Sequence, residues 1–197
     1  MGQYYKPCIL EDDGQTVKSW MYSHDYDNGI KIMEHSYIDN DFVSAFESLI
    51  KNYPQRVVWA GDYGDKTPYE KVTDTPEGII DFGKESNFYD RCTEFTQVKP
   101  KNMDMSKFRY ILNHDKKLFI DKEKCPKEKD EWANQIHPLP LLTTDGVDEN
   151  GPRGGGDYNG TSMNLIGSWK GDLISIEKEL PLNFKELIPN FNEKKRN

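Results

Sequence analysis

Histidine and aspartate stand side by side at two places in the chain, as His24-Asp25 and His114-Asp115. Imidazole and carboxylate groups are the ligands of hydrolytic divalent metals, and an aspartate beside a histidine can also orient a general base. The spacing matches no HxH, HExxH or helical i,i+4 ligand pair. A metal-dependent, phosphoesterase-like hydrolase with a divalent metal at these four residues is therefore an alternative hypothesis, beside the simpler one that the histidines cap turns.

Residues 145–160 have the most unusual local composition, with six glycines and a single arginine. Adjacent glycines expose backbone amides, and a guanidinium offers a planar fork, so together they suit a phosphate or carboxylate. The Lys-Ser/Thr that closes a P-loop is missing and no clear helix follows, which excludes Walker and Rossmann phosphate loops. We expect an anion to be bound by Arg153, Gly154, Gly155, Gly156 and Asp157. The alternative is a loop that only connects its neighbours.

Trp59 and Asp62 stand where a short apolar strand is expected to end. A carboxylate beside an aromatic wall can hold a base, a sugar or a cationic side chain, so both residues are assigned to the same predicted ligand site. Core packing of Trp59, with Asp62 in a turn, is the alternative.

Composition excludes several classes of partner. The net charge is −8, and the one basic cluster is the short tail at residues 194–196, so general nucleic-acid binding is not expected. Apolar stretches are far shorter than the ~20 residues of a membrane helix, so no membrane association is expected. The N-terminal residues do not resemble a secretory signal.

The cysteines point to a reducing compartment. Cys8, Cys92 and Cys125 are odd in number, widely spaced and without a CxxC pair, which argues against a disulfide framework and against a thiolate zinc site. We therefore expect the cytoplasm. No Gly-x-Ser-x-Gly sequence or recognisable nucleophilic cysteine supports a serine or cysteine hydrolase.

The elements that must position these residues are mostly predicted strands. Apolar runs separated by turn residues predict three hairpins and one central strand. The hairpins join residues 3–10 to 17–22, 108–112 to 118–120, and 163–169 to 173–176, and the central strand is 56–60.

Helices are fewer. After Asn40, the residues Phe42, Phe46 and Leu49 form an apolar stripe at helical spacing that should stop before Pro54. A second helical period over residues 30–37 and a helical turn over 184–188 are also predicted.

Two other segments are expected to be non-helical. Residues 136–142 should be extended because they contain two prolines. Residues 61–107 should hold loops and short helices.

These elements predict an α+β fold in which a mainly antiparallel sheet, built from hairpins, is packed by one or two helices and carries long polar loops. Residues 1–197 should form one domain, with an irregular insert at about 64–107 and a frayed tail at about 190–197. The oligomeric state is not predicted.

Several motifs together look like an uncharacterised family of small hypothetical proteins from low-GC Gram-positive bacteria and their phages. The similarity covers most of the chain except about residues 64–106. The motifs are Gly2-Gln-Tyr-Tyr-Lys6, Trp20-Met-Tyr-Ser-His-Asp-Tyr26, Lys31-Ile-Met-Glu-His-Ser36, Arg56-Val-Val-Trp-Ala-Gly-Asp-Tyr63 and Ile136-His-Pro-Leu-Pro-Leu-Leu142, followed by the glycine-rich segment. The resemblance implies a phage or mobile-element setting and assigns no catalytic residue.

The leading hypothesis is thus a phage-type accessory protein that works by binding and needs no cofactor. Its partner would be a small anionic, nucleotide-like ligand or a host protein, and interference with host defence would be one such role.

Overall fold

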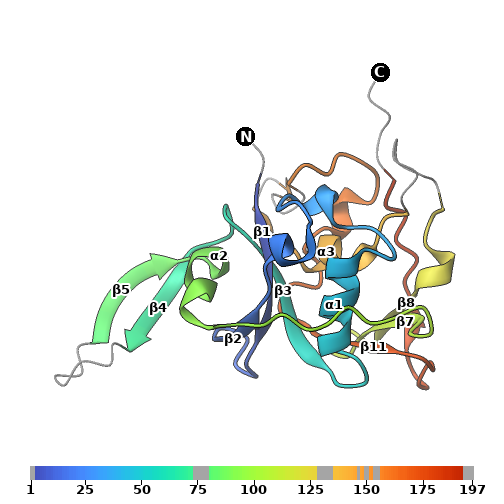
Figure 1. The fold of residues 1–197 in the computed structure, drawn as a ribbon, viewed down its shortest axis with the longest axis horizontal. Coiled ribbons are helices and arrows are strands. Elements are labelled where there is room, and N and C mark those ends of the chain that lie inside the picture. The colour runs from blue at the N-terminus through green and yellow to red at the C-terminus, as the bar shows by residue number, and fades with distance from the viewer. Residues whose placement is uncertain are drawn as a thin grey trace.

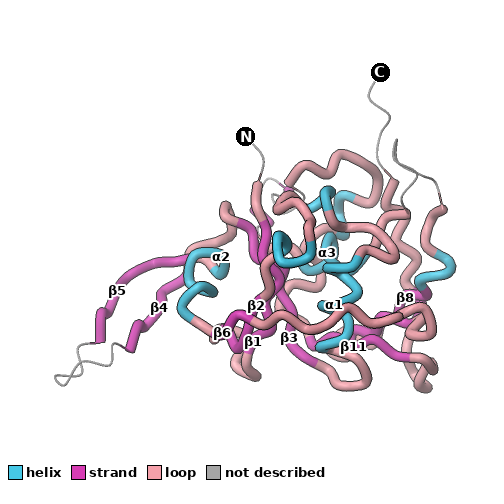
Figure 2. Tube along the Cα trace, viewed as in Figure 1, coloured by secondary structure: helices cyan, strands magenta, loops and turns pink. Residues whose placement is uncertain are grey.

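The fold is α+β, as predicted: a mostly antiparallel sheet carries a few short helices (Figures 1 and 2). The computed structural model describes residues 3–72, 80–127, 135–145, 147–148, 151–152 and 156–192. For residues 68–72, 80–84, 147–148 and 151–152 only the backbone is described.

The strands are β1 (Tyr5–Leu10), β2 (Val17–Trp20), β3 (Gln55–Gly61), β4 (Thr67–Val72), β5 (Ile80–Ser86), β6 (Thr96–Gln97), β7 (Tyr110–Asn113), β8 (Leu118–Asp121), β9 (Val147–Asp148), β10 (Gly151–Pro152), β11 (Leu173–Glu177) and β12 (Lys185–Glu186). The α-helices are α1 (Asp41–Leu49), α2 (Phe88–Arg91) and α3 (Pro138–Thr143). The 3-10 helices are η1 (Ser23–Tyr26), η2 (Ile32–Glu34), η3 (Cys92–Glu94), η4 (Lys122–Lys124) and η5 (Met163–Leu165). No helix in the described ranges has the length and apolar character needed to cross a membrane.

Eight strands form the main sheet in the order β12-β8-β7-β11-β3-β1-β2-β6. The pairs inside the sheet are antiparallel, whereas the two-residue strands at its edges, β12 and β6, run parallel to their neighbours β8 and β2. The predicted hairpins β1–β2 and β7–β8 are confirmed, as is the central strand β3. The strand pairs β4–β5 and β9–β10 lie outside this sheet.

The neighbouring strands β1 and β3 are covered on both faces. Because side chains alternate along a strand, Val57 and Trp59 of β3 enter the large core beside α1, while Val58 and Ala60 enter a second, smaller core beside α2. Figure 1 shows these two helices on opposite sides of β1 and β3. Burial on both faces explains why β3 is a continuous apolar run and not an alternating one.

Helix α1 begins where the sequence predicts. The side chain of Asn40 accepts hydrogen bonds from the backbone N–H groups of Phe42 (2.9 Å) and Val43 (3.1 Å), which caps the first turn. Phe42 and Phe46 are fully buried and point at the sheet, where the Phe46 ring centroid lies 4.9 Å from that of Trp59.

Trp59 lies at the centre of the large core with none of its surface exposed. Its indole N–H donates a 2.9 Å hydrogen bond to Nε2 of His35, which therefore carries its proton on Nδ1 and donates it to the carbonyl of Gly29 (3.1 Å). Burial lowers the pKa of His35 to about 4, so its ring is neutral near pH 7.

The sequence predicted an extended segment at residues 136–142, but the structure places helix α3 there. The error lies in the use of proline as a helix breaker: Pro138 and Pro140 both fall in the first turn, where backbone N–H groups have no partner within the helix. His137 caps this turn, because its Nδ1 accepts from the N–H of Leu139 (3.2 Å).

The helix predicted over residues 30–37 is also wrong. The chain instead forms the short turn η2, because neighbouring segments take its backbone groups. Tyr5 N donates to the carbonyl of Ile30 (2.9 Å), and Met33 N donates to the carboxylate of Asp157 (3.0 Å). The apparent helical period was misleading: Ile30, Met33 and Tyr37, which would share one helical face, are only half-buried, whereas Ile32 is fully buried in the core.

The third hairpin did not form as predicted. Strand β11 pairs with β7 and β3, while the segment before it makes η5 and a series of turns. Those turns are bonded to α3: Gly167 N donates to Leu141 O (2.9 Å) and Trp169 N to Leu142 O (2.7 Å). The helical turn predicted over residues 184–188 is wrong as well, because β12 lies there.

The two segments predicted to be irregular are partly ordered. Within residues 64–107, β4 and β5 form a hairpin that projects from the body (Figure 1), followed by α2, η3 and β6. In the predicted frayed tail, Phe191 is buried, and Asn192 N donates to Thr161 Oγ1 (3.1 Å). Residues 193–197 lie outside the described ranges.

Truncating Phe46 to alanine should destabilise the protein by about 3–5 kcal/mol, because the ring is fully buried against Trp59 and its removal leaves a cavity. Urea unfolding measures the difference between Phe46→Ala and wild type. A loss under about 1 kcal/mol would show that this side of α1 is not core.

Acid should destabilise the protein through His35. The unfolded chain protonates His35 below pH about 6.5, whereas the folded protein does so only near pH 4, so the free energy of unfolding falls as the pH is lowered across that window. The loss is roughly 3 kcal/mol, since one pKa unit corresponds to about 1.4 kcal/mol.

The matched variant is His35→Gln, whose amide oxygen can still accept from Trp59 but does not titrate. His114 and His137 remain in both proteins, so the difference between the two pH profiles isolates His35. Profiles of equal slope between pH 4 and 6.5 would contradict the assignment.

Candidate functional site

The first predicted metal pair, His24-Asp25, is engaged in local contacts. His24 Nδ1 lies 3.0 Å from the carbonyl of Asn28 and serves the turn around η1. Asp25 accepts a 2.8 Å hydrogen bond from Gln97 and lies 3.9 Å from the ammonium group of Lys99. Asp25 thus joins η1 to the segment around β6, whereas the His24 ring bonds within its own turn.

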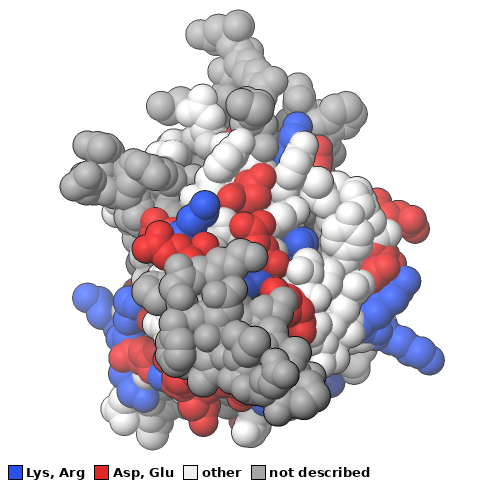
Figure 3. Space-filling view, turned by 90° about the vertical axis from the view of Figure 1, so that its left-hand side faces the viewer, with Lys and Arg blue, Asp and Glu red and all other residues white. Residues whose placement is uncertain are grey.

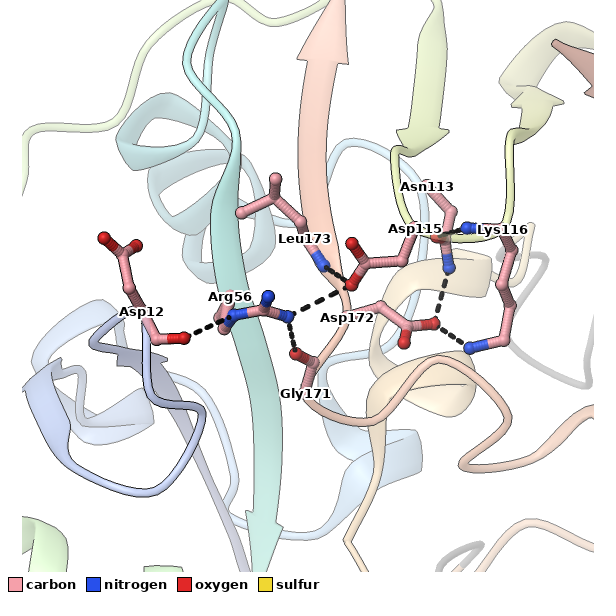
Figure 4. A network of polar contacts seen from close by, with 8 residues as sticks. All are labelled: Asp12, Arg56, Asn113, Asp115, Lys116, Gly171, Asp172 and Leu173. Carbon is pink, nitrogen blue, oxygen red and sulfur yellow. Dashed lines mark hydrogen bonds and ion pairs between the residues drawn. The ribbon is translucent and has the colours of Figure 1, made fainter.

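The second pair, His114-Asp115, lies in the β7–β8 turn, and Figure 4 shows Asp115 with its partners. Asp115 Oδ2 accepts from Arg56 of β3 (3.1 Å) and from the N–H of Leu173 (3.1 Å), which ties the turn to β11. His114 Nε2 lies 2.8 Å from the hydroxyl of Ser175, which in turn donates to Glu177 (2.8 Å). Since the Ser175 proton goes to the carboxylate, His114 must donate from Nε2.

No metal site emerges from these pairs. Across the part of the chain that the structure describes, no group of three or more histidine, cysteine, aspartate or glutamate side chains could hold a metal ion. The His24 ring bonds within its own turn, as the turn-capping interpretation expects, whereas the His114 ring contacts Ser175 of β11.

The predicted anion loop lies only partly within the described ranges. Arg153, Gly154 and Gly155 lie outside them. Gly156 has a φ of +56°, and a Cβ built there would lie 2.8 Å from the Tyr5 ring, so glycine is needed for this approach. Asp157 accepts from Met33 N, and burial raises the pKa of its carboxyl group.

Trp59 and Asp62 have structural partners. Trp59 is entirely buried, so it is a core residue and no wall of an open site. Asp62 Oδ1 accepts from Tyr4 N (3.0 Å), and its carbonyl accepts from the Asn87 side chain (3.0 Å). Even so, the end of β3 and the glycine-rich segment meet, because Gly61 and Gly156 both lie against the Tyr5 ring.

The surroundings of that meeting point are acidic. Burial and the nearby charges of Asp157, Asp62 and Asp145 raise the pKa of Tyr5 well above its usual range. The ammonium group of Lys170 pairs with one of these carboxylates, that of Asp145, and with Asp65 (3.7 Å). Figure 3 shows acidic side chains gathered on one face of the molecule, with some basic side chains among them. The described surroundings therefore disfavour an anion, and binding through Arg153 stays a prediction.

A different polar cluster lies between α1, η4 and α3. The carboxylate of Glu47, which is 2% exposed, lies 2.9 Å from Nε2 of His137 and accepts two hydrogen bonds from Lys122 (2.8 and 3.0 Å). Because His137 Nδ1 already accepts from Leu139 N, its Nε2 must donate to Glu47. The cluster therefore holds one anion, one cation and one neutral imidazole.

The pKa values fit this assignment. Burial lowers the pKa of His137 despite the nearby Glu47 charge, which keeps the ring neutral. Burial alone would raise the pKa of Glu47, but His137 and Lys122 outweigh it and lower that pKa. Of these two partners we assign the charge compensation to Lys122, since His137 has no free ring nitrogen for a second proton.

A second ion-pair group adjoins the first. Arg109 makes a two-pronged contact with Asp121, with distances of 2.6 and 2.5 Å, and a third contact with Glu123 at 2.6 Å. Lys122 N also donates to the carbonyl of Arg109 (3.0 Å). The two groups are thereby joined through η4.

A cavity of about 210 Å³ opens onto both groups. Segments around α1, residues 105–109, residues 122–127 and residues 135–137 line it. Its cations and hydroxyls are Arg109, Lys122, Lys127, Ser44 and Ser106, and its carboxylates are Asp39, Glu47 and Glu123. This is the candidate functional site, which we call the α1–η4 cavity.

Sequence reasoning missed this site, although one signal was present. Val43, Glu47 and Ile50 share one helical face at i, i+4 and i+7, which places a carboxylate on the buried side of α1. Nothing in the order of residues shows that Lys122 and His137, from two distant segments, meet it.

Comparison of the chain with protein-family models, with curated proteins and with solved structures found no match. The resemblance to phage proteins therefore stays a prediction.

Removing the cation of the buried cluster should be costly. Lys122→Met leaves the Glu47 carboxylate buried without its countercharge, and we expect a loss of about 3 kcal/mol or more in the free energy of unfolding. The matched control is Lys124→Met on the same turn, whose ammonium pairs with Glu186 at the surface, where solvent screens the interaction, so its loss should be much smaller. Urea unfolding compares the two, and equal losses would argue against a buried charge pair.

Proposed function

We propose that the protein is a binding protein for a small ligand with an anionic group, and that the ligand enters the α1–η4 cavity. The observation that carries this proposal is the gathering of three cationic side chains and two serine hydroxyls, Arg109, Lys122, Lys127, Ser44 and Ser106, around one opening. Such groups are the usual donors to carboxylates and phosphates.

The cations differ in availability. Lys122 and Arg109 already face Glu47, Asp121 and Glu123, so a ligand gains little from them beyond hydrogen bonds. Lys127 makes no ion pair with any residue in the described ranges and is exposed at the rim. We therefore assign recognition of the anionic group to Lys127.

Size and charge narrow the ligand class. A cavity of about 210 Å³ lies below the roughly 300–1,000 Å³ of sites for drug-sized molecules, which favours a compact acid over a whole nucleotide. Three cations face three carboxylates in the lining, so a ligand that also carries hydrogen-bond donors, as an amino acid or hydroxy acid does, matches both signs.

The contacts among Glu47, Lys122 and His137 favour a binding site over a catalytic one. Both ring nitrogens of His137 are hydrogen-bonded, and Lys122 contacts both oxygens of Glu47, so these groups hold one another in place. A general base needs a free lone pair directed at the substrate, and His137 offers none.

The setting of this function rests on the sequence. The motifs that resemble phage proteins, together with cysteines that are free in the structure, support an accessory protein acting in the reducing cytoplasm of a host. Sequestering a small host metabolite would be one way for such a protein to interfere with host defence.

Calorimetric titration of small dicarboxylates, amino acids, inorganic phosphate and nucleoside monophosphates tests the proposal. Wild type should bind a compact acid, and Lys127→Gln should weaken that binding by about 1.5–3 kcal/mol, the range for a hydrogen bond to a charged group. Lys124→Gln, which removes a lysine outside the cavity, should bind like wild type.

Arg153→Gln separates the cavity from the glycine-rich segment. If this variant loses binding while Lys127→Gln keeps it, the ligand belongs to the segment around Arg153 and the α1–η4 cavity is not the site. If wild type binds none of the compounds, a host protein replaces the small ligand as the expected partner.

A further inference from the structure

Two cysteines far apart in the chain come together in the smaller core. Cys8 lies on β1, between Trp20 of β2 and Val58 of β3, and Cys92 lies at the junction of α2 and η3. Neither residue is exposed, and both belong to the same apolar cluster beneath α2. Each thiol donates to a backbone carbonyl in this core, Cys8 Sγ to Lys6 O (3.6 Å) and Cys92 Sγ to Tyr89 O (3.2 Å), and the two thiols influence each other's pKa.

A buried positive charge lies close to the two cysteines. Lys6, which is 8% exposed, points into the same region: its ammonium group lies 3.8 Å from the Tyr89 ring centroid and donates to the Tyr89 carbonyl (3.2 Å). The Cys92 thiol lies 3.2 Å from that same carbonyl. A buried ammonium beside two thiols favours a thiolate, which is the reactive form of cysteine.

The two thiols differ in acidity. The neighbouring Cys8 thiol lowers the pKa of Cys92, and the charge of Lys6 adds to this effect. Burial, followed by the contact with Cys92, raises the pKa of Cys8. We therefore assign Cys92 as the nucleophile and Cys8 as the thiol that stays neutral, with its S–H directed at the Lys6 carbonyl.

We propose that Cys8 and Cys92 are a redox pair in which a hydroperoxide oxidises Cys92 and Cys8 then closes a disulfide between β1 and η3. This inference does not depend on the ligand proposed for the α1–η4 cavity, which lies on the other face of the sheet beside α1.

The chemistry balances in two steps. The Cys92 thiolate attacks the terminal oxygen of the hydroperoxide, an S–O bond forms as the O–O bond breaks, and the leaving alkoxide takes a proton and departs as the alcohol, or as water from hydrogen peroxide. The Cys8 sulfur then attacks the Cys92 sulfenic acid, and the S–O bond breaks while the S–S bond forms. The released hydroxide takes the Cys8 proton and leaves as water. Two thiols are oxidised, and one hydroperoxide is reduced.

Access requires a small oxidant or a local opening. Hydrogen peroxide is close to water in size, whereas glutathione disulfide would need the segment from α2 to η3 to detach. That segment is short, consisting of Phe88–Arg91 and Cys92–Glu94, and rests on a core separate from the main one. Local openings of this kind cost less than global unfolding.

The experiment treats the native, reduced protein with hydrogen peroxide and measures its intact mass, its free thiols after denaturation and its disulfide-linked peptides. We expect the mass to fall by two hydrogen atoms, one of the three free thiols to remain, and the linked peptides to contain Cys8 and Cys92. Dithiothreitol should restore all three thiols. A native protein that keeps three thiols, or a link that includes Cys125, would show that the pair does not react as proposed.

Variants assign the roles. Cys8→Ser should stop at the sulfenic acid of Cys92, which dimedone labels, and Cys92→Ser should give neither label nor disulfide. Cys125→Ser is the matched control: burial raises the pKa of Cys125 to about 12 and it lies in the other core, so this variant should oxidise like wild type. Equal oxidation of Cys8 with or without Cys92 would overturn the order of events. Circular dichroism checks that each variant is folded, and the wild-type mass measurement needs no variant.

Discussion

The indole N–H of Trp59 must find an acceptor in the middle of the core, and much of the fold is organised around the one it finds. The group donates to His35, which in turn donates to the carbonyl of Gly29, so a strand, a 3-10 turn and the loop before it are joined by one chain of hydrogen bonds. An unpaired N–H at this depth would cost about 1–3 kcal/mol. The segment before α1 therefore has to follow the irregular path that places His35, which also explains why it cannot form a regular helix.

The same strand separates two environments of different chemistry. On one face Trp59 meets the rings of α1, and behind α1 the buried Glu47 is paired with Lys122 and hydrogen-bonded by the neutral His137. On the other face Val58 meets a small core that contains two thiols and a buried ammonium. Because side chains alternate along β3, one apolar run supports a polar cavity and a sulfur-containing core without direct contact between them.

The sequence predicted those elements whose stabilising interactions lie within one helix or across one turn. The cap at Asn40 and the stripe of Phe42 and Phe46 act within one helix, and the hairpins β1–β2 and β7–β8 act across one turn, so these elements were predictable. The start of α3 was missed because Pro138 was judged by its usual effect and not by its position in the first turn. The partners of Glu47 and Cys8 come from segments distant in the chain, and no local pattern shows such meetings. His114 and Asp115 show that a local pattern can also mislead. The dipeptide suggested a metal site, but Asp115 connects a turn to β11 and β3.

The outermost strands of the main sheet, β6 and β12, are two residues long and run parallel to their neighbours. A sheet edge offers unpaired backbone groups to any extended chain it meets, and a long, regular edge is a template for association. A two-residue strand offers too few such groups to hold a fourth or fifth hydrogen bond in register. The ends of this sheet are thus poor starting points for edge-to-edge association between copies of the protein.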